Sequence, residues 1–216
     1  KPTWLNRTYP NVINFEGVHG LEQLKWSEIN TDQVTYDVTM PFIRMVAGPV
    51  DYTQGAMRNA TKKTFRAINN EPMSQGTRCR QLAQYVIFES PLNMLCDSPD
   101  SYENQTECTE FIAAIPTVWD NTIAMNGKIG EYISIARRKG DIWYVGSLTN
   151  WDARTLYLDL SFLGEGSWQA EIFKDGLNAD RIAADYKKEI INIPSDREIN
   201  ISMAAGGGYA MKIFRK

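Results

Sequence analysis

The spacing of apolar positions changes near residue 115, and this change divides the chain into two parts. In the first part the pattern is helical or irregular, and it predicts helices over residues 34–46, 76–90 and 103–114. Thr31 and Asp32 are candidate N-caps for the first of these helices. Pro41 lies inside that helix and should kink or break it, because proline has no backbone N–H to donate.

In the second part apolar and polar residues alternate, which is the period of a half-buried strand. The alternation predicts strands over residues 132–137, 142–148, 155–160, 168–174, 189–193 and 209–214. Residues 138–141 (RKGD) join the first two strands as a hairpin turn. Short strands between Gly, Asp and Asn turns indicate an antiparallel β-sandwich of about 100 residues. The first part has too few elements for a core of its own, so we expect it to end a larger α/β domain.

The composition allows a large core and disfavours two kinds of partner. Hydrophobic residues make up 43% of the 216 positions. A formal net charge of −3 offers no basic face to nucleic acid. No uncharged apolar run approaches the roughly 18 residues of a membrane span, and residues 1–4 lack the apolar core of a signal peptide. The odd number of cysteines, Cys79, Cys96 and Cys108, excludes a complete disulfide framework; one bridge is allowed by the count, and we expect buried free thiols.

Glu16 and Glu22 are the first candidates for chemistry, because Gly17 and Gly20 punctuate the stretch that carries them. Glycines permit tight turns, so the two carboxylates can converge on one point. Paired carboxylates serve as the acid and its partner in glycoside hydrolysis, and they also bind calcium, which takes six to eight oxygen ligands. The spacing alone is a weak signal, and by itself it favours two solvated loop glutamates.

His19 and Asp51 are candidate substrate-binding residues. His19 is the single histidine of the chain, so it is a poor metal site, and the choice between a substrate contact and a hydrogen-bonded loop residue stays open. Asp51 follows a short strand-like pair, where a barrel enzyme would direct it to the active site. It also suits a simple turn after Pro49.

Several stretches together resemble glycoside hydrolase family 97. They are residues 14–22 (NFEGVHGLE), 41–53 (PFIRMVAGPVDYT), 76–83 (GTRCRQLA), 126–130 (NGKIG), 135–140 (IARRKG) and 175–181 (DGLNADR). The resemblance runs over nearly the whole chain. It implies that residues 1–115 are the C-terminal part of a (β/α)8 catalytic barrel and that residues 116–216 are the C-terminal β-sandwich domain.

The same resemblance implies roles for the two glutamates. Glu22 matches the general acid that protonates the leaving glycosidic oxygen. Glu16 matches a carboxylate ligand of a catalytic Ca²⁺ ion, and Glu22 also lies near that ion. The family pattern places a catalytic base upstream of Lys1 and a further calcium ligand in an N-terminal domain, so the missing N-terminal part of the parent enzyme is an expected partner of this chain.

Three functions remain in competition. The motif around Glu16 and Glu22 favours a periplasmic, inverting α-glucosidase that acts on starch-type oligosaccharides. A retaining α-galactosidase of the same family is the alternative, and its nucleophile would come from another barrel strand. The third function is a non-catalytic carbohydrate-binding or structural fragment. In each case we expect no turnover from the isolated chain, since part of the catalytic set is missing.

Overall fold

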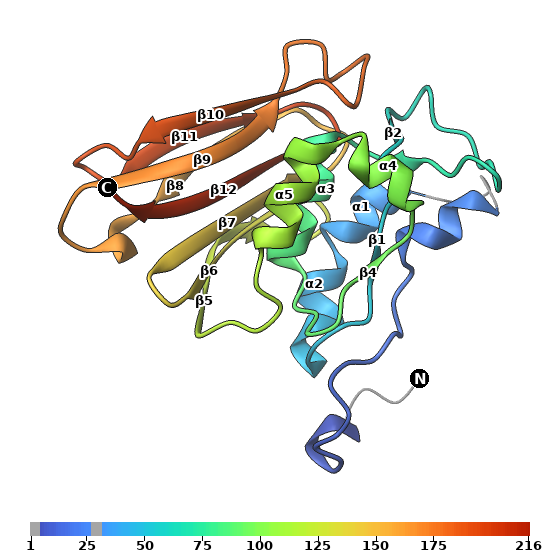
Figure 1. Ribbon diagram of the computed structural model, residues 1–216, viewed down its shortest axis with the longest axis horizontal. Coiled ribbons are helices and arrows are strands. Elements are labelled where there is room, and N and C mark those ends of the chain that lie inside the picture. The colour runs from blue at the N-terminus through green and yellow to red at the C-terminus, as the bar shows by residue number, and fades with distance from the viewer. Residues whose placement is uncertain (1–4, 27–31) are drawn as a thin grey trace.

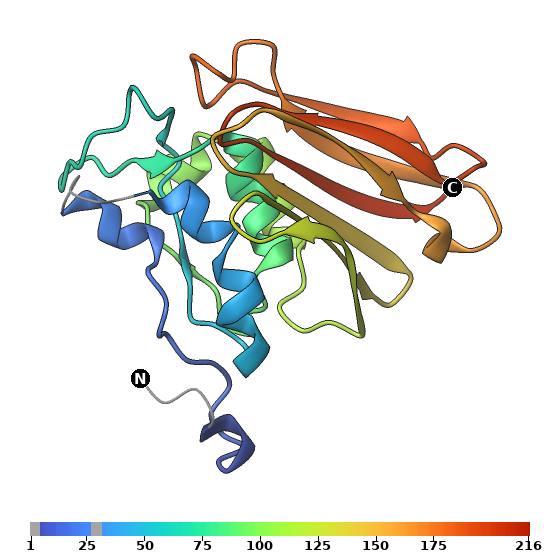
Figure 2. The same ribbon diagram turned by 180° about the vertical axis from the view of Figure 1, so that it is seen from behind.

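The computed structural model describes residues 5–26 and 32–216 (Figure 1). Residues 1–4 and 27–31, which include the candidate cap Thr31, lie outside the described residues. The N-terminal helices and short strands gather at one end of the molecule, and the long strands fill the other end (Figures 1 and 2). The predicted change from helical to strand-like spacing near residue 115 therefore also divides the molecule in space.

A six-stranded antiparallel sheet is the middle layer of the molecule, with the strand order β10-β9-β12-β7-β6-β5. Its strands are β5 (Asn121–Lys128), β6 (Tyr132–Lys139), β7 (Ile142–Thr149), β9 (Trp168–Asp175), β10 (Tyr186–Asn192) and β12 (Gly208–Arg215). Two further strands, β8 (Arg154–Asp159) and β11 (Glu198–Met203), pair as a second antiparallel sheet. The sandwich-like, antiparallel part of the predicted fold is confirmed.

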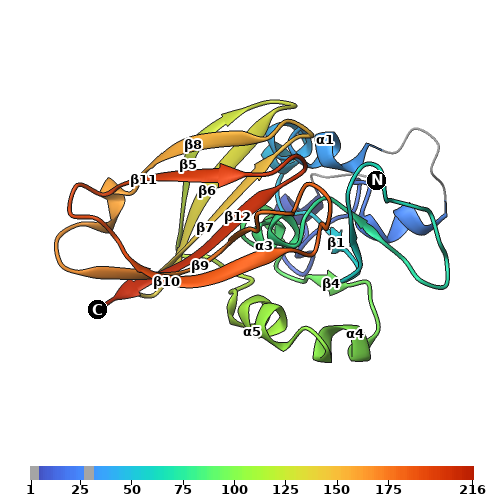
Figure 3. The same cartoon turned by 90° about the horizontal axis from the view of Figure 1, so that it is seen from above.

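Other elements cover both faces of the six-stranded sheet over its central strands, whereas the edge strands β5 and β10 are more exposed. On one face Val145 and Met211 pack with Leu158 and Ile201 of the second sheet. On the other face the sheet contacts the helix α3 (Arg78–Ile87), which lies between the sheet and the strand β1 (Figure 3). The core on this side joins residues from both parts of the chain, because it contains Leu82, Val86, Tyr144, Leu148 and Ala210.

Two glycines allow α3 to lie close to the sheet. A Cβ atom on Gly146 would come within 2.7 Å of the Ala83 carbonyl oxygen, and one on Gly208 would overlap the backbone of Arg80. Any side chain at these positions would push the helix away from the strands. The two parts of the chain are thus fitted to each other by backbone contact.

The first part has short strands, and each described pairing among them is parallel. Phe15 bridges Val50, β1 (Thr53–Gln54) pairs with β4 (Met94–Leu95), and β2 (Asn59–Ala60) pairs with β3 (Ser74–Gln75). Parallel strands need crossover connections, which helices usually supply. In residues 5–26 and 32–115 these pairs do not close a barrel.

The helices of the first part are shorter than predicted. The predicted helix over residues 34–46 is divided into α1 (Gln33–Asp37), α2 (Met40–Ile43) and the 3-10 helix η3 (Met45–Ala47). Asp32 caps α1 as predicted, since its carboxylate accepts a bond from the Thr35 N–H at 3.0 Å. Pro41 lies in the first turn of α2, where no N–H is needed, so the chain breaks before it. The predicted helix over residues 103–114 is α4 (Pro99–Glu103) followed by α5 (Thr106–Ala114).

Two strands of the sandwich, β5 and β11, were not predicted, and neither were the short strands β1 to β4 of the first part. β5 is mostly exposed and contains a bulge between Ala124 and Asn126, so its side chains do not alternate cleanly. β11 does alternate, with Ile199, Ile201 and Met203 facing inward, and that signal was present in the sequence. The remaining short elements are the 3-10 helices η1 (Leu5–Arg7), η2 (Leu21–Lys25) and η4 (Ser161–Leu163).

Candidate functional site

The candidate site is built on residues 15–22, which we call the glutamate loop. The loop begins where Phe15 bridges Val50 in parallel, and the Asp51 N–H donates to the Phe15 carbonyl at 2.7 Å. Glu16 and Asp51 therefore follow directly after bridged residues on neighbouring chain segments that run in the same direction. The structure therefore places these two predicted site residues at the same end of the parallel bridge between Phe15 and Val50.

Arg44 fixes the start of the glutamate loop. Its Nη2 donates to the Phe15 carbonyl at 2.9 Å and to the Glu16 carbonyl at 3.0 Å. The same guanidinium donates to the carbonyls of Gly48 and Pro49 at 3.1 and 3.2 Å. One side chain thus ties the loop to the segment that leads into Asp51. The loop then turns at Gly17, whose φ of +69° favours glycine.

His19 lies at the centre of the loop and is held by side chains of α1. Its backbone N–H donates to the Tyr36 hydroxyl at 3.0 Å, and its backbone carbonyl accepts from Gln33 Nε2 at 2.7 Å. Its Nδ1 lies 2.8 Å from Gln33 Oε1. As a whole residue, His19 is exposed.

Glu22 lies in η2, whose neighbours Leu21 and Leu24 are buried in the core. Its carboxylate folds back over Gly20, where a Cβ atom would overlap Glu22 Oε2. That oxygen is inaccessible and has no hydrogen-bond partner among the described residues. Because a buried carboxylate oxygen without a partner is costly, this position suits a ligand or a residue from outside the chain.

The glutamate loop therefore carries Glu16, His19 and Glu22, with Asp51 on the adjoining segment. Within residues 5–26 and 32–216, no group of three or more His, Cys, Asp or Glu side chains is arranged to hold a metal ion. A calcium ion takes six to eight oxygen ligands. The chain thus has carboxylates and an unpartnered oxygen that suit part of a calcium site, and the remaining ligands would have to come from elsewhere.

A buried polar cluster, which the sequence did not predict, lies behind the loop. Asp37 is fully buried, and its carboxylate accepts from Tyr52 at 2.8 Å, Gln33 at 3.0 Å and Gln84 at 2.7 Å. Arg80 completes the set with an ion pair of 3.3 Å. Burial raises the pKa of Asp37, and the Arg80 charge opposes that rise. Only the tertiary structure brings these polar residues together, since nothing in their spacing marks them.

The tryptophans and cysteines have structural positions. Trp143 and Trp168 are buried in the sandwich core, and Trp151 donates from Nε1 to the Asp32 carboxylate at 2.8 Å across the seam between the two parts. Cys79 and Cys108 are buried free thiols, as predicted, and Cys96 is a half-buried free thiol.

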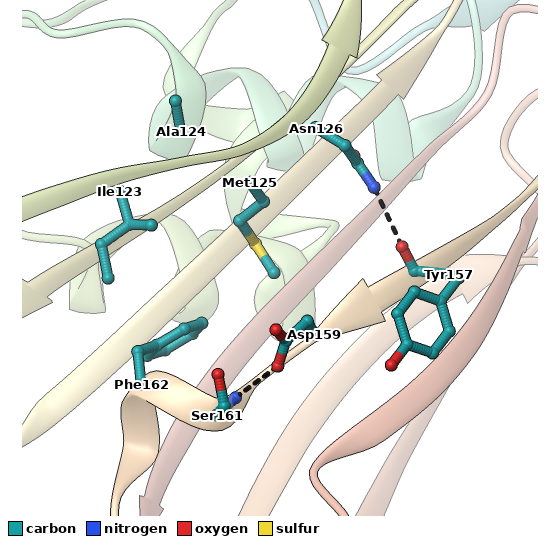
Figure 4. A pocket seen from close by; sticks show the side chains of 8 residues that line it. All are labelled: Ile123, Ala124, Met125, Asn126, Tyr157, Asp159, Ser161 and Phe162. Carbon is teal, nitrogen blue, oxygen red and sulfur yellow. Dashed lines mark hydrogen bonds between the residues drawn. The ribbon is translucent and has the colours of Figure 1, made fainter.

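A cavity of about 460 Å³ lies between β5 and β8, at the open side of the sandwich (Figure 4). Its lining includes Met125, Tyr157, Asp159 and Phe162, and the Asp159 carboxylate is already bonded to the Ser161 N–H at 2.8 Å. None of the lining residues belongs to the glutamate loop. The candidate chemistry and this cavity are separate features of the molecule.

No helix in the described ranges is long and apolar enough to cross a membrane. Residues 118–214 match the family model described as "Glycosyl-hydrolase 97 C-terminal, oligomerisation". This match covers nearly the whole sandwich.

Two curated proteins are similar to almost the entire chain. A retaining α-galactosidase of Bacteroides thetaiotaomicron is 62% identical over 213 residues, which are 99% of this chain and 32% of that protein. A probable retaining α-galactosidase of Streptomyces bingchenggensis is 29% identical over 97% of this chain and 29% of its own length. The chain thus spans about a third of the length of these relatives.

A solved structure is also similar to nearly the whole chain. A glycoside hydrolase family 97 enzyme from Pseudoalteromonas sp. strain K8, in complex with acarbose, superposes with a TM-score of 0.85 at 33% identity, over 98% of this chain and 33% of that one. The chain belongs to glycoside hydrolase family 97, and it corresponds to the C-terminal portion of such enzymes.

Proposed function

We propose that the chain is the C-terminal portion of a retaining α-galactosidase, in which residues 1–115 end a (β/α)8 catalytic barrel and residues 116–216 form the sandwich domain. The observation that carries the choice of branch is the 62% identity to a retaining α-galactosidase over 99% of the chain. The parallel pairing of the short strands in the first part supports the barrel assignment.

In this proposal Glu22 is the general acid and base. A retaining glycosidase needs one carboxylic acid that gives its proton to the glycosidic oxygen as the bond to the anomeric carbon breaks. A second carboxylate attacks that carbon, and the resulting ester is cleaved by a water molecule whose proton returns to the first group. Glu22 takes the first role, and the attacking carboxylate belongs to the portion of the parent outside this chain.

The fixed position of Glu22 supports this role. Gly20 leaves room for its carboxylate, and the buried Leu21 and Leu24 hold η2 in place. A proton donor must be held at a constant distance from the bond that it cleaves. We assign Glu16 and Glu22 as carboxylate ligands of a Ca²⁺ ion, with Glu22 binding only through the oxygen that does not carry the proton, because a cation favours the ionised form. When bound, the ion would orient the sugar and balance developing charge. His19 and Asp51 are assigned to substrate binding.

The product anomer tests the proposal directly. The parent enzyme is incubated with an α-galactoside, and the first free sugar is followed by NMR. Retention gives the α-anomer first. The β-anomer as first product, or faster turnover of α-glucosides than of α-galactosides, would overturn the proposal.

A substitution in the same enzyme tests the role of Glu22. Glu22→Gln should lower kcat/KM on an unactivated α-galactoside by about 10²–10⁴-fold, the usual contribution of general acid catalysis. The loss should be smaller for an aryl galactoside, whose leaving group needs less protonation. Glu103→Gln is the matched control, because Glu103 is exposed on α4. Equal losses for both substrates would contradict an acid role.

Calcium binding needs a separate measurement. Titration of metal-free parent enzyme with Ca²⁺ in a calorimeter should give weaker binding for Glu16→Gln than for Glu103→Gln. Unchanged affinity in Glu16→Gln would remove Glu16 from the ligand set without affecting the role of Glu22.

An inverting α-glucosidase is the second candidate. The acarbose-bound Pseudoalteromonas enzyme of the same family supports it, at 33% identity. Inversion would release the β-anomer first, so the assay of product anomer separates the two candidates. A periplasmic location also stays a prediction, which cell fractionation would test.

A further inference from the structure

The ring of His19 is bonded on one side only. Its Nδ1 lies 2.8 Å from Gln33 Oε1, while Nε2 has no hydrogen-bond partner among the described residues. A neutral imidazole carries one proton, and the bond made by one nitrogen decides which of the two holds it. The identity of the Gln33 atom facing Nδ1 therefore decides the tautomer of His19.

The orientation of the Gln33 amide is fixed by its other partners. The atom 2.7 Å from the His19 carbonyl must be nitrogen, because a carbonyl oxygen can only accept. The same nitrogen donates to the Asp37 carboxylate at 3.0 Å. The atom that faces His19 Nδ1 is then the amide oxygen, which also can only accept. It follows that Nδ1 carries a hydrogen and that Nε2 of the neutral ring is an acceptor.

Gln33 has little freedom to depart from this arrangement. Only 2% of the residue is exposed, and its backbone N–H donates to Gln75 Oε1 at 3.0 Å. Its acceptor Asp37 is in turn held by Tyr52, Gln84 and Arg80. The amide is thus buried and bonded at both ends, whereas His19, whose ring it orients, is an exposed residue.

We propose that Gln33 is a positioning residue that holds neutral His19 with Nδ1 protonated, so that Nε2 accepts a hydrogen bond from a hydroxyl group of the sugar. This proposal rests on the assignment of the glutamate loop to substrate binding. Gln33 touches His19 and Asp37 and acts on the substrate through the ring of His19.

The tautomer is measurable because His19 is the only histidine of the 216 residues. The chain is labelled with ¹⁵N-histidine, and long-range ¹H–¹⁵N correlation spectra at a pH where the ring is neutral distinguish the two nitrogens. The wild-type chain should give the Nδ1-protonated form. Gln33→Met, which keeps the length of the side chain but removes the amide, should shift the ring towards the Nε2-protonated form.

Tyr36→Phe is the matched control. It removes the hydroxyl bonded to the His19 N–H and leaves the ring bond to Gln33 intact, so the tautomer should not change. An Nε2-protonated ring in the wild-type chain, or an unchanged tautomer in Gln33→Met, would overturn the proposal.

Kinetics of the parent enzyme give a second measurement that does not need the isolated chain. Gln33→Met should raise KM for the galactoside by about tenfold, the value of one hydrogen bond, with little change in kcat. An unchanged KM would overturn the proposal. If the tautomer behaves as expected but His19→Ala leaves KM unchanged, the positioning by Gln33 stands and the assignment of His19 to the substrate fails.

Discussion

Asp37 and Arg80 form an ion pair of 3.3 Å in which both side chains are 0% exposed. Arg80 also donates to the carbonyls of Val34 and Thr149, each at 2.7 Å. Val34 belongs to α1 and Thr149 ends β7, so a single guanidinium links the helix behind the glutamate loop to the sandwich. The sandwich thereby contributes to holding the candidate site in place.

Loss of this ion pair should destabilise the protein strongly. Arg80→Met leaves the Asp37 carboxylate buried without its charged partner, which should lower the free energy of unfolding by about 3–5 kcal/mol. Urea unfolding measures the change. Lys139→Met is the control, because its ion pair with Asp120 is on the surface and should contribute little. The double variant Asp37→Leu/Arg80→Met should recover part of the loss, and a further loss would contradict this account.

The carboxylate of Asp175 should give the protein a characteristic pH dependence. Burial raises its pKa from 3.8 to about 6, although its Oδ2 accepts from the N–H groups of Ala204 and Gly208. The folded protein then holds a proton between about pH 4 and 6 that the unfolded chain releases. The stabilisation from this residue is complete below pH 4 and is lost as the pH rises through 6.

Asp175→Asn removes this titration and therefore tests it. The stability of the variant relative to wild type should rise between pH 4 and pH 7, by up to about 3 kcal/mol for a shift of this size. Thermal unfolding at a series of pH values, with the exposed Asp180→Asn as control, checks the difference. A stability difference that stays constant with pH would show that the pKa of Asp175 is not raised.

Gly20→Ala should impair catalysis more than folding. The backbone of Gly20 is extended, with φ −80° and ψ 164°, so alanine adopts it without strain. Its Cβ atom, however, would displace the Glu22 carboxylate. In the parent enzyme kcat/KM should fall by about 10²-fold, because a small displacement of an acid is costly. Gly140→Ala, which has a φ of +57° in the remote hairpin turn, should reduce stability without this loss of activity.

Gly146→Ala tests the close contact between α3 and the sheet. Its Cβ atom would meet the Ala83 carbonyl at 2.7 Å and the Val86 Cβ at 3.1 Å, so helix and strand must separate. Overpacking of this kind should cost about 1–3 kcal/mol in the free energy of unfolding. Chemical denaturation measures it, and unchanged stability would mean that α3 is free to shift away from β7.

The sequence by itself determined the strands and turns of the sandwich that depend on local pattern. The alternation over residues 132–148 predicted β6 and β7 and their hairpin, because each residue of a strand has its side chain on the opposite face from the next. Several short stretches along the chain, including the one with Glu16 and Glu22, together resembled the family, because each is a local run of residues that can be recognised without the fold. The stretch with Glu16 and Glu22 also favoured the α-glucosidase branch, whereas the relative with 62% identity supports the α-galactosidase branch in our proposal.

Only the tertiary structure decided what surrounds these motifs. Asp37, Tyr52 and Arg80 are far apart in sequence, and no local pattern predicts that they share one buried cluster. The break before Pro41 depends on where α2 begins, and the buried fraction of Glu22 depends on how η2 packs. Contacts between distant segments leave no periodic pattern in the sequence. The hydrogen bonds between Gln33 and His19 could therefore be identified only from the tertiary structure.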